Sequence, residues 1–257
     1  MKTKGKPSEV PVIGILGWEA GHEDTLGQLE QIPGNIAHPD TFSFPVLYKR
    51  VRGAYYQTVV VQPKTEVLVA MIEASKKMER EGVKAIMTGC GFNAIFQGEL
   101  ANAVDVPVFA SSLIQVPIVY QMLSKGQKVG IITADRACLT EEHLRAVGIT
   151  EETPVCILGI EDTGEFSRIR ADPKVVLDVG KFEQEVVEVA KRLVKREELV
   201  GAIVLECTDL PPFAATMRRA LGLPVFDIVT LAHMVYESLT GDRWGKEEKI
   251  EGSGSAV

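Results

Sequence analysis

Short apolar runs alternate along the chain with longer stretches in which apolar residues recur at helical spacing. The runs with the length and β-branched content of buried strands cover residues 11–16, 84–88, 106–110, 128–133 and 201–205. Between them, residues 64–81 and 182–196 place apolar side chains on one face of a helix. Residues 151–174 are acidic and show no periodicity, which predicts an irregular loop. Strand, crossover helix and parallel strand in this order predict an α/β architecture.

The chain contains an internal repeat. The sequence Ala-Ile-Met-Thr-Gly-Cys, which ends at Cys90, returns as Ala-Ile-Val-Leu-Glu-Cys, which ends at Cys207. A Pro-Val-Phe element follows each cysteine at the same spacing of 17 residues, with its proline at Pro107 and Pro224. The glycine of a further matching apolar run precedes Cys90 by 76 residues and Cys207 by 77. Three landmarks that keep one register indicate a duplicated unit.

The repeat predicts two pseudo-symmetric lobes, each a parallel sheet flanked by helices. We expect lobe 1 to contain residues 1–112 with 230–257, and lobe 2 to contain residues 113–229. In open parallel sheets, ligands bind at the carboxyl ends of the strands, which is where the repeat puts its two cysteines. The active site is therefore expected in the cleft between the lobes.

Composition and charge exclude several classes of function. The 257 residues allow a sizeable core, and 46% hydrophobic with 25% charged residues is typical of a globular chain in water. The net charge of −7 and the lack of a long basic run argue against nucleic acid as a partner. No run approaches 18 uninterrupted apolar residues and no apolar signal core follows the N-terminus, so we expect no membrane partner.

Cysteine usage and the motifs that the sequence lacks narrow the chemistry further. The four cysteines occur singly, which predicts a reducing, cytoplasmic environment rather than a disulfide scaffold or a zinc knuckle. The sequence contains no Gly-Lys-Ser/Thr, GxGxxG, GxSxG or HExxH motif, and its four histidines share no ligand spacing. We therefore expect neither a cofactor nor a metal ion.

The two repeated cysteines, Cys90 and Cys207, are the candidate reactive groups. Each follows a buried strand and precedes a helix, where backbone N–H groups and the helix dipole lower a cysteine pKa and favour the thiolate. A lone cysteine is more often a small buried hydrophobic residue. Cys138 and Cys156 have no counterpart in the repeat and keep that interpretation. For the pair, the shared position in the repeat favours a reactive role.

Two thiols that face each other across a cleft suit a carbon acid, a substrate that loses a proton beside a carboxylate. One cysteine, as thiolate, takes the proton, and the other, as thiol, supplies a proton from the opposite side. Backbone N–H groups of Gly91, Phe92, Thr208 and Asp209 are candidate donors to the enolate-like intermediate. A metal ion held by both cysteines and a histidine is a competing interpretation, disfavoured because no ligand pair shares a local spacing.

The segments Cys90-Gly91-Phe92-Asn93 and Cys207-Thr208-Asp209-Leu210, in a duplicated α/β chain, resemble the aspartate/glutamate/hydantoin racemase superfamily. The likeness covers nearly the whole chain. It is nearest to the branch that contains the algal dimethylsulfoniopropionate lyases. The further segments that carry it are residues 34–42, 107–117, 205–212 and 224–227.

The resemblance implies that Cys90 and Cys207 form the acid/base pair. It also implies that Ser111, Ser112, Thr133 and Thr208 lie where relatives contact the substrate carboxylate. Gly91, Phe92 and Asn93, which follow Cys90, are further candidate substrate-binding residues. Thr133 follows an apolar run whose mate is the first strand, so the repeat also puts it at the cleft. A threonine that ends a strand and caps the next helix is the alternative there.

Two more residues have open alternatives. Asp209 either orients Cys207 or caps the following helix, and the sequence favours the cap. His38 lies inside a segment shared with the family, and either lines the cleft entrance or shapes a turn before Pro39. The resemblance also implies a homodimer.

We derive one main functional hypothesis and two alternatives. The main hypothesis is a cofactor-independent racemase or epimerase that acts at the carbon alpha to the carboxylate of an amino acid or related small acid. A lyase that performs β-elimination on a small carboxylate, such as dimethylsulfoniopropionate, shares the first proton abstraction. A two-lobed carboxylate-binding protein without catalytic activity is the remote alternative.

Overall fold

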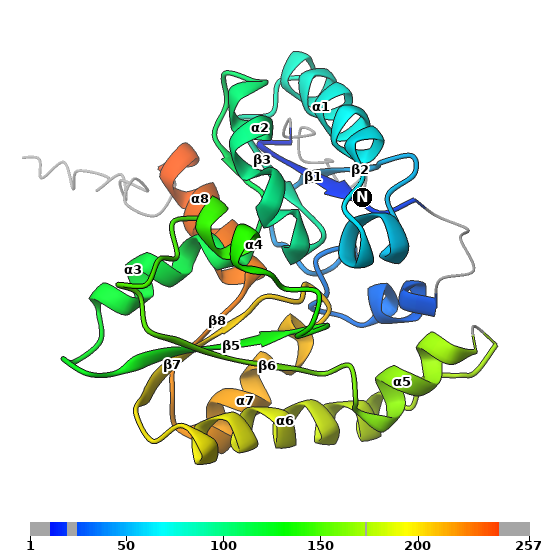
Figure 1. Ribbon diagram of the computed structural model, residues 1–257. Helices are drawn as coiled ribbons and strands as arrows, with labels where there is room; N and C mark the ends of the chain where they lie inside the picture. The colour runs from blue at the N-terminus through cyan, green and yellow to red at the C-terminus, as the bar shows by residue number, and fades with distance from the viewer. Residues whose placement is uncertain (1–10, 20–24, 173, 242–257) are drawn as a thin grey trace, which may run out of the picture.

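Two four-stranded parallel sheets form the framework of the molecule (Figure 1). The computed structural model describes residues 11–19, 25–172 and 174–241. The first sheet has the order β2-β1-β3-β4, and its strands are β1 (Ile13–Gly17), β2 (Val46–Arg50), β3 (Ala85–Thr88) and β4 (Val108–Phe109). The second sheet has the order β6-β5-β7-β8, and its strands are β5 (Lys128–Thr133), β6 (Val155–Gly159), β7 (Val200–Leu205) and β8 (Val225–Phe226).

The helices cover the faces of both sheets. The α-helices are α1 (Thr65–Arg80), α2 (Gln97–Asn102), α3 (Val116–Gln121), α4 (Glu141–Ala146), α5 (Gly164–Ala171), α6 (Val179–Arg196), α7 (Ala214–Leu221) and α8 (Ile228–Thr240). Shorter 3₁₀ or π-helical turns are η1 (Thr25–Gln31), η2 (Gln57–Val61), η3 (Gly91–Phe96), η4 (Ser112–Gln115) and η5 (Pro211–Phe213). Several of these turns lie directly after strands and bring polar side chains to the region between the sheets.

The same strand order in both sheets confirms the two-lobed α/β architecture expected from the repeat. β1 pairs with β2 and β3, and β5 pairs with β6 and β7, always in parallel. Each apolar run predicted as a strand contains one. The central strands β1, β3, β5 and β7 are almost entirely buried because helices cover both faces of each sheet.

The expectation of an irregular loop over residues 151–174 is wrong. This segment contains the edge strand β6 and helix α5. β6 pairs with only one neighbour and is only partly buried, so its sequence lacks the continuous apolar run of a central strand. The other edge strand, β2, has a similarly half-exposed pattern and escaped the sequence analysis for the same reason.

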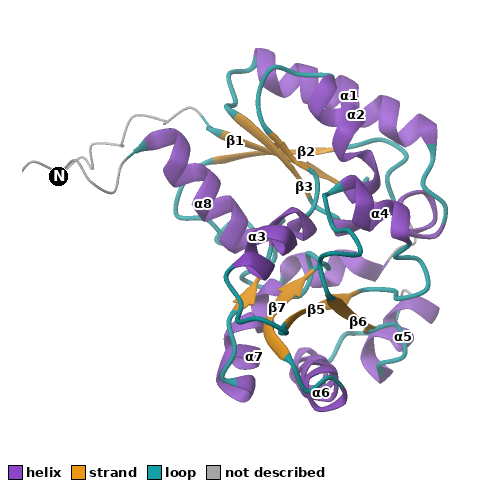
Figure 2. Ribbon diagram, turned by 60° about the vertical axis from the view of Figure 1, so that its left-hand side comes forward, coloured by secondary structure: helices purple, strands orange, loops and turns teal. Residues whose placement is uncertain are grey.

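The last helix, α8, returns to the first sheet, beside which Figure 2 shows it. Asp227 caps this helix by accepting the Thr230 N–H at 2.7 Å, and the Thr230 side chain accepts the Asp227 N–H in return. Apolar side chains of α8 pack against one face of β1 and β3 in a cluster that includes Ile15, Met87 and Leu231. The opposite face of this sheet packs against α1. The C-terminal end of the described chain therefore completes the first lobe.

In the part of the chain that the structure describes, we find no helix with the length and apolar character needed to cross a membrane.

We expect Leu231→Ala to lower the free energy of unfolding by about 2–5 kcal/mol, because it leaves a cavity between α8 and the first sheet. Leu231 is 1% exposed, whereas Met234 on the same helix is 53% exposed. The control Met234→Ala should change the free energy of unfolding by less than about 0.5 kcal/mol. Urea unfolding followed by circular dichroism measures both, and equal effects of the two variants would contradict the packing of α8.

Candidate active site

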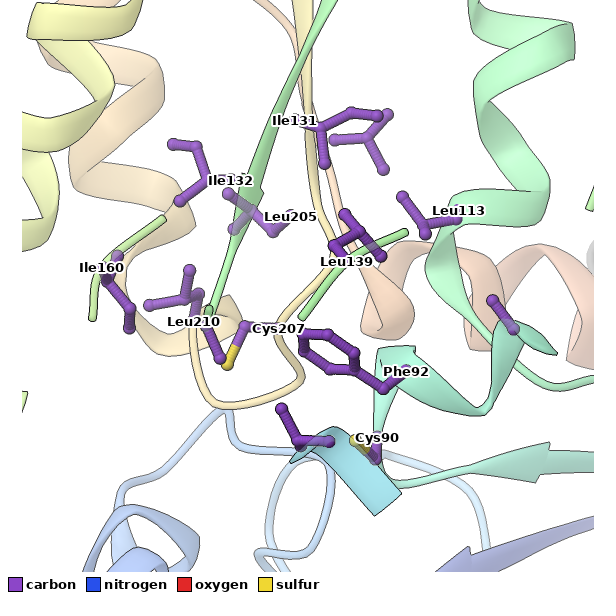
Figure 3. Packing of buried hydrophobic residues seen from close by; sticks show 14 of the residues in the cluster. Cys90, Phe92, Leu113, Ile131, Ile132, Leu139, Ile160, Leu205, Cys207 and Leu210 are labelled. Atoms are coloured by element: carbon purple, nitrogen blue, oxygen red, sulfur yellow. The ribbon is translucent and has the colours of Figure 1, made fainter. Parts of the chain in front are cut away.

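The two repeated cysteines lie at the carboxyl ends of the central strands. Cys90 comes two residues after β3, and Cys207 comes two residues after β7. Both are buried, with 7% and 6% of their surface exposed. Figure 3 shows them on facing segments of the two lobes. The Thr208 hydroxyl donates to the Gly89 carbonyl at 2.8 Å, so a direct hydrogen bond joins the two cysteine segments.

A cavity of about 480 Å³, counting its part open to solvent, brings both cysteines together. Its lining comes from both lobes and consists of Trp18, Glu30, Tyr56, Val60, Gly89, Cys90, Gly91, Phe92, Ala134, Phe166, Glu206, Cys207, Thr208 and Asp209. Four of these side chains are aromatic and three are carboxylic acids. Among the described residues, no lysine, arginine or histidine lines the cavity.

The expected low pKa of the two thiols is wrong. Burial raises the pKa of Cys90 well above the ordinary value, and the nearby charge of Glu206 raises it further. Burial does the same to the pKa of Cys207, with Asp209 as the next cause. Backbone N–H groups, such as that of Phe92 at Cys90, lower the pKa as the motif predicts, but their effect is smaller than that of burial. The surroundings of both cysteines therefore favour the thiol over the thiolate.

Asp209 contacts Cys207. The Cys207 Sγ lies 3.9 Å from Asp209 Oδ2 and is placed to donate to it. Asn35 Nδ2 donates to the other carboxylate oxygen at 2.7 Å, which fixes the carboxylate from the first lobe. The turn that follows has Leu210 as its N-cap residue, without a capping side chain. The sequence analysis favoured a helix cap for Asp209, and the structure favours the orienting role instead.

Glu206 is a cavity residue that the sequence analysis missed. Its side chain is 0% exposed, and its Oε2 accepts a hydrogen bond from Thr133 Oγ1 at 2.7 Å. Burial raises the pKa of Glu206 to about 7. The available signal was a glutamate that ends an apolar run directly before Cys207, where the other half of the repeat has Gly89. The Thr133 hydroxyl thus serves Glu206, and Thr133 is not among the cavity-lining residues.

Gly91 lies against Glu206. A Cβ atom at position 91 would come within 2.2 Å of both the Glu206 carbonyl oxygen and its Oε1. No side chain fits there unless the Glu206 segment moves. Gly91 and Phe92 line the cavity, as does Thr208 from the opposite lobe.

Three other predicted substrate-binding residues are buried beside the cavity without lining it. The Ser111 hydroxyl accepts the Leu113 N–H and so caps η4. The Ser112 hydroxyl donates to the Leu205 carbonyl of the opposite lobe at 2.7 Å. Asn93 is 0% exposed, and its side-chain amide has no hydrogen-bond partner among the residues that the structure describes. Ser111 thus caps a local turn and Ser112 joins the two lobes, and the role of both in substrate binding stays a prediction.

His38 shapes a turn. Its Nδ1 accepts the Asp40 N–H at 3.2 Å, and the ring is absent from the cavity lining. Of its two alternatives, the turn is therefore the one that the contacts support. Across the described ranges, no group of three or more His, Cys, Asp or Glu residues is arranged to hold a metal ion.

Curated relatives with sequence similarity are algal enzymes. The chain is 30% identical over 209 residues to a dimethylsulfoniopropionate lyase of Durusdinium sp. clade D, covering 78% of this chain and 68% of that protein. It is 29% identical over 231 residues to dimethylsulfoniopropionate lyase 7 of Emiliania huxleyi, covering 86% and 65%. The chain spans between 60% and 68% of the length of the first four relatives.

Solved structures share the fold at lower identity. An allantoin racemase from Pseudomonas fluorescens has a TM-score of 0.59 and 17% identity, with 88% of this chain and 89% of that chain covered. An aspartate racemase homologue from Pyrococcus horikoshii has a TM-score of 0.55 and 18% identity, with 90% and 99% covered. The family model for Asp/Glu/hydantoin racemases matches residues 13–234, which include both lobes and both cysteines. The chain belongs to the aspartate/glutamate/hydantoin racemase family.

Proposed function

We propose that this protein removes a proton from the carbon next to the carboxylate of a small acid and returns one to the opposite face, without a cofactor. Cys90 and Cys207 are the acid/base pair of this racemase or epimerase. The observation that carries the proposal is their meeting at one cavity from equivalent positions of two lobes. Proton transfer from opposite faces requires this arrangement of two groups.

The raised pKa values require a route by which a thiol becomes a base. The Cys207 thiol transfers its proton to Asp209 Oδ2, which lies 3.9 Å away. The resulting thiolate takes the substrate proton on one face, and the Cys90 thiol gives its proton to the other face. After this turnover Cys207 is a thiol and Cys90 is a thiolate. The reverse reaction follows the same steps in the opposite order. The N–H groups directed at Cys90 stabilise its thiolate.

The cavity lining favours a substrate that carries a positive charge besides its carboxylate. Aromatic faces and carboxyl groups attract a cation, and Trp18 supplies such a face beside the three carboxyl groups of the lining. Arg170 already lies over the rings of Tyr56 and Phe166. The Trp18 indole Nε1 is buried without a hydrogen-bond partner among the described residues, so its N–H is a donor available to the substrate carboxylate. We infer a small zwitterion, with an ammonium or a sulfonium group.

β-Elimination is a second candidate, favoured by the curated relatives. In that reaction one thiolate takes the proton next to the carboxylate, and the electron pair forms a C=C bond while the β-substituent leaves. Those relatives are named for dimethylsulfoniopropionate as their substrate. Elimination shares the first step with racemisation, and it needs one base rather than two.

We also propose that the protein works in the cytoplasm as a homodimer. The four scattered cysteines, all free, support a reducing compartment. The division into residues 1–112 with 230–257 and residues 113–229 is likewise our proposal for the two lobes. A carboxylate-binding protein without catalysis is the outcome that the next experiment would reveal as ligand binding without proton exchange.

We expect Cys90→Ser and Cys207→Ser each to lower α-proton exchange by at least about 10²-fold, because each removes one proton-transfer group. The control is Cys138→Ser, which alters a cysteine outside the cavity lining. Exchange is followed by proton NMR in deuterated water. Full activity in both cavity variants would contradict the two-cysteine mechanism.

The same NMR measurement separates the two reactions. We expect loss of the α-proton signal without a new product for the substrate among aspartate, glutamate, a substituted hydantoin and dimethylsulfoniopropionate. Vinyl protons of acrylate from dimethylsulfoniopropionate would instead establish the lyase. In that case only the variant that loses the base should be inactive, because the opposite face needs no proton.

Asp209→Asn should lower kcat by roughly 10²-fold, since the amide cannot accept the Cys207 proton as the carboxylate does. The matched control is Asp40→Asn, which alters an exposed carboxylate outside the cavity lining. Stopped-flow or steady-state kinetics at saturating substrate measures the change. A kcat equal to that of the unaltered protein would remove Asp209 from the mechanism.

A further inference from the structure

The Glu206 carboxyl group is buried between the two lobes, with Thr133 of one lobe and Gly91 of the other against it. Its backbone is held because its N–H donates to the Ile132 carbonyl at 2.8 Å. Its Oε2 accepts from Thr133, at the end of β5. Its Oε1 is buried and has no hydrogen-bond partner among the described residues. One oxygen of this carboxyl group is thus anchored, and the other is unpaired beside the cavity.

Glu206 is adjacent to both reactive segments. It is bonded along the chain to Cys207, and its unpaired Oε1 lies against Gly91, the residue after Cys90. A negative charge on this carboxyl group raises the pKa of both thiols. Gly89 is its counterpart before Cys90 and also contacts the opposite segment, through Thr208, but it has no side chain, so of these two residues only Glu206 can carry a charge.

The other titratable groups around the cavity leave Glu206 without a positive partner. Two arginines contact residues of the lining. Arg50 donates two hydrogen bonds to Glu30, of 3.1 and 2.6 Å, and Arg170 lies over the Tyr56 ring and pairs with Asp135 at 3.8 Å. The titratable or charged groups that face the cavity from its surrounding elements are Glu30, Tyr56, Cys90, Cys207 and Asp209. A thiolate formed here therefore adds to carboxylate charge rather than neutralising a cation.

We propose that Glu206 is a positioning residue that keeps its own proton in the working site and thereby allows one of the two cysteines to carry the negative charge. Two adjacent buried acids do not both ionise readily, because like charges in a low dielectric repel strongly. When Glu206 is neutral, the thiolate experiences only Asp209 and the N–H groups directed at it. When Glu206 ionises, both thiols hold their protons more tightly. Because Glu206 gains or loses its proton near neutral pH, it makes the readiness of the two thiols to ionise depend on pH in that range.

This inference rests on the proposed function, because it assumes that one cysteine becomes a thiolate during the reaction. Its test, however, needs no substrate. Iodoacetamide, a neutral reagent, alkylates thiolates, and peptide mass spectrometry reads each cysteine separately. At about pH 6 we expect Glu206→Gln and the unaltered protein to be alkylated at the same rate at each of the two cysteines. The reason is that Glu206 is protonated, and therefore uncharged, in the unaltered protein at this pH. At about pH 8.5 the variant should alkylate roughly tenfold faster, since a shift of one pKa unit changes the thiolate fraction tenfold.

A second variant tests the effect of Glu206 on the two cysteines by altering Thr133, which donates a hydrogen bond to Glu206 Oε2. The Thr133 hydroxyl favours the charged form of Glu206 and lowers its pKa. Thr133→Val should therefore keep Glu206 protonated to higher pH. Ionised Glu206 slows alkylation of the two cysteines by raising their pKa, and in this variant that effect should begin at a higher pH than in the unaltered protein. This variant removes one hydroxyl and conserves side-chain volume, so it also serves if Glu206→Gln does not fold.

Cys156 supplies the matched control within the same protein. Burial raises the pKa of Cys156 to about 11, and the charge of Glu197 is the next cause. Glu197→Gln should speed alkylation at Cys156 and leave the two cavity cysteines unchanged, whereas Glu206→Gln should do the reverse. A rate ratio between Glu206→Gln and the unaltered protein that is the same at both pH values would overturn the inference.

Failure of the inference and failure of the proposed function give different results. If Glu206→Gln leaves the thiol titrations unchanged while the cysteine variants lose proton exchange, only the role of Glu206 is wrong. If the cysteine variants keep full exchange while Glu206→Gln shifts the thiol titrations, the coupling holds but the two-cysteine mechanism does not.

Discussion

The structure depends on a few hydrogen bonds that join the carboxyl ends of two parallel sheets. The Thr208 hydroxyl bonds to the Gly89 carbonyl, and the Ser112 hydroxyl bonds to the Leu205 carbonyl. Each bond joins a residue beside one central strand to the opposite lobe. Because the strands end here, their carbonyl and N–H groups need partners other than a neighbouring strand. The side chains that supply them fix the distance between the two cysteine segments.

The same closeness determines the electrostatics. A region narrow enough for hydrogen bonds between lobes excludes water, and burial is the first cause of the raised pKa of Cys90, Cys207 and Glu206. N–H groups at strand ends still favour thiolates, but here desolvation outweighs them. Both cysteines therefore keep their protons unless the loss of charge from a neighbouring acid, or the charge of a bound substrate, lowers their pKa.

The sequence predicts the parts of this arrangement that are periodic or repeated. The duplicated run before each cysteine predicts β3 and β7, and hence the meeting of Cys90 with Cys207. Edge strands such as β6 escape because partial exposure removes their apolar signature. Glu206 escapes because its counterpart in the repeat is a glycine, so symmetry gives it no emphasis. The direction of the thiol pKa shifts depends on burial by segments far apart in sequence, which no local motif reports.

The two halves of the site are equivalent in backbone and unequal in chemistry. Glu206 lies beside both cysteines, but Asp209 Oδ2 is 3.9 Å from the Cys207 Sγ, whereas the backbone N–H groups of Phe92 and Asn93 are directed at Cys90. One cysteine therefore has an acceptor for its proton, and the other has donors for its thiolate. A racemase uses both cysteines as base and acid in turn. Because two enantiomers have equal free energy, kcat/KM is the same in both directions, and the inequality changes only how kcat and KM are divided in each direction. A lyase needs only the cysteine with the acceptor. Under the proposed mechanism, the side chains after each central strand therefore decide which of the two reactions this framework supports.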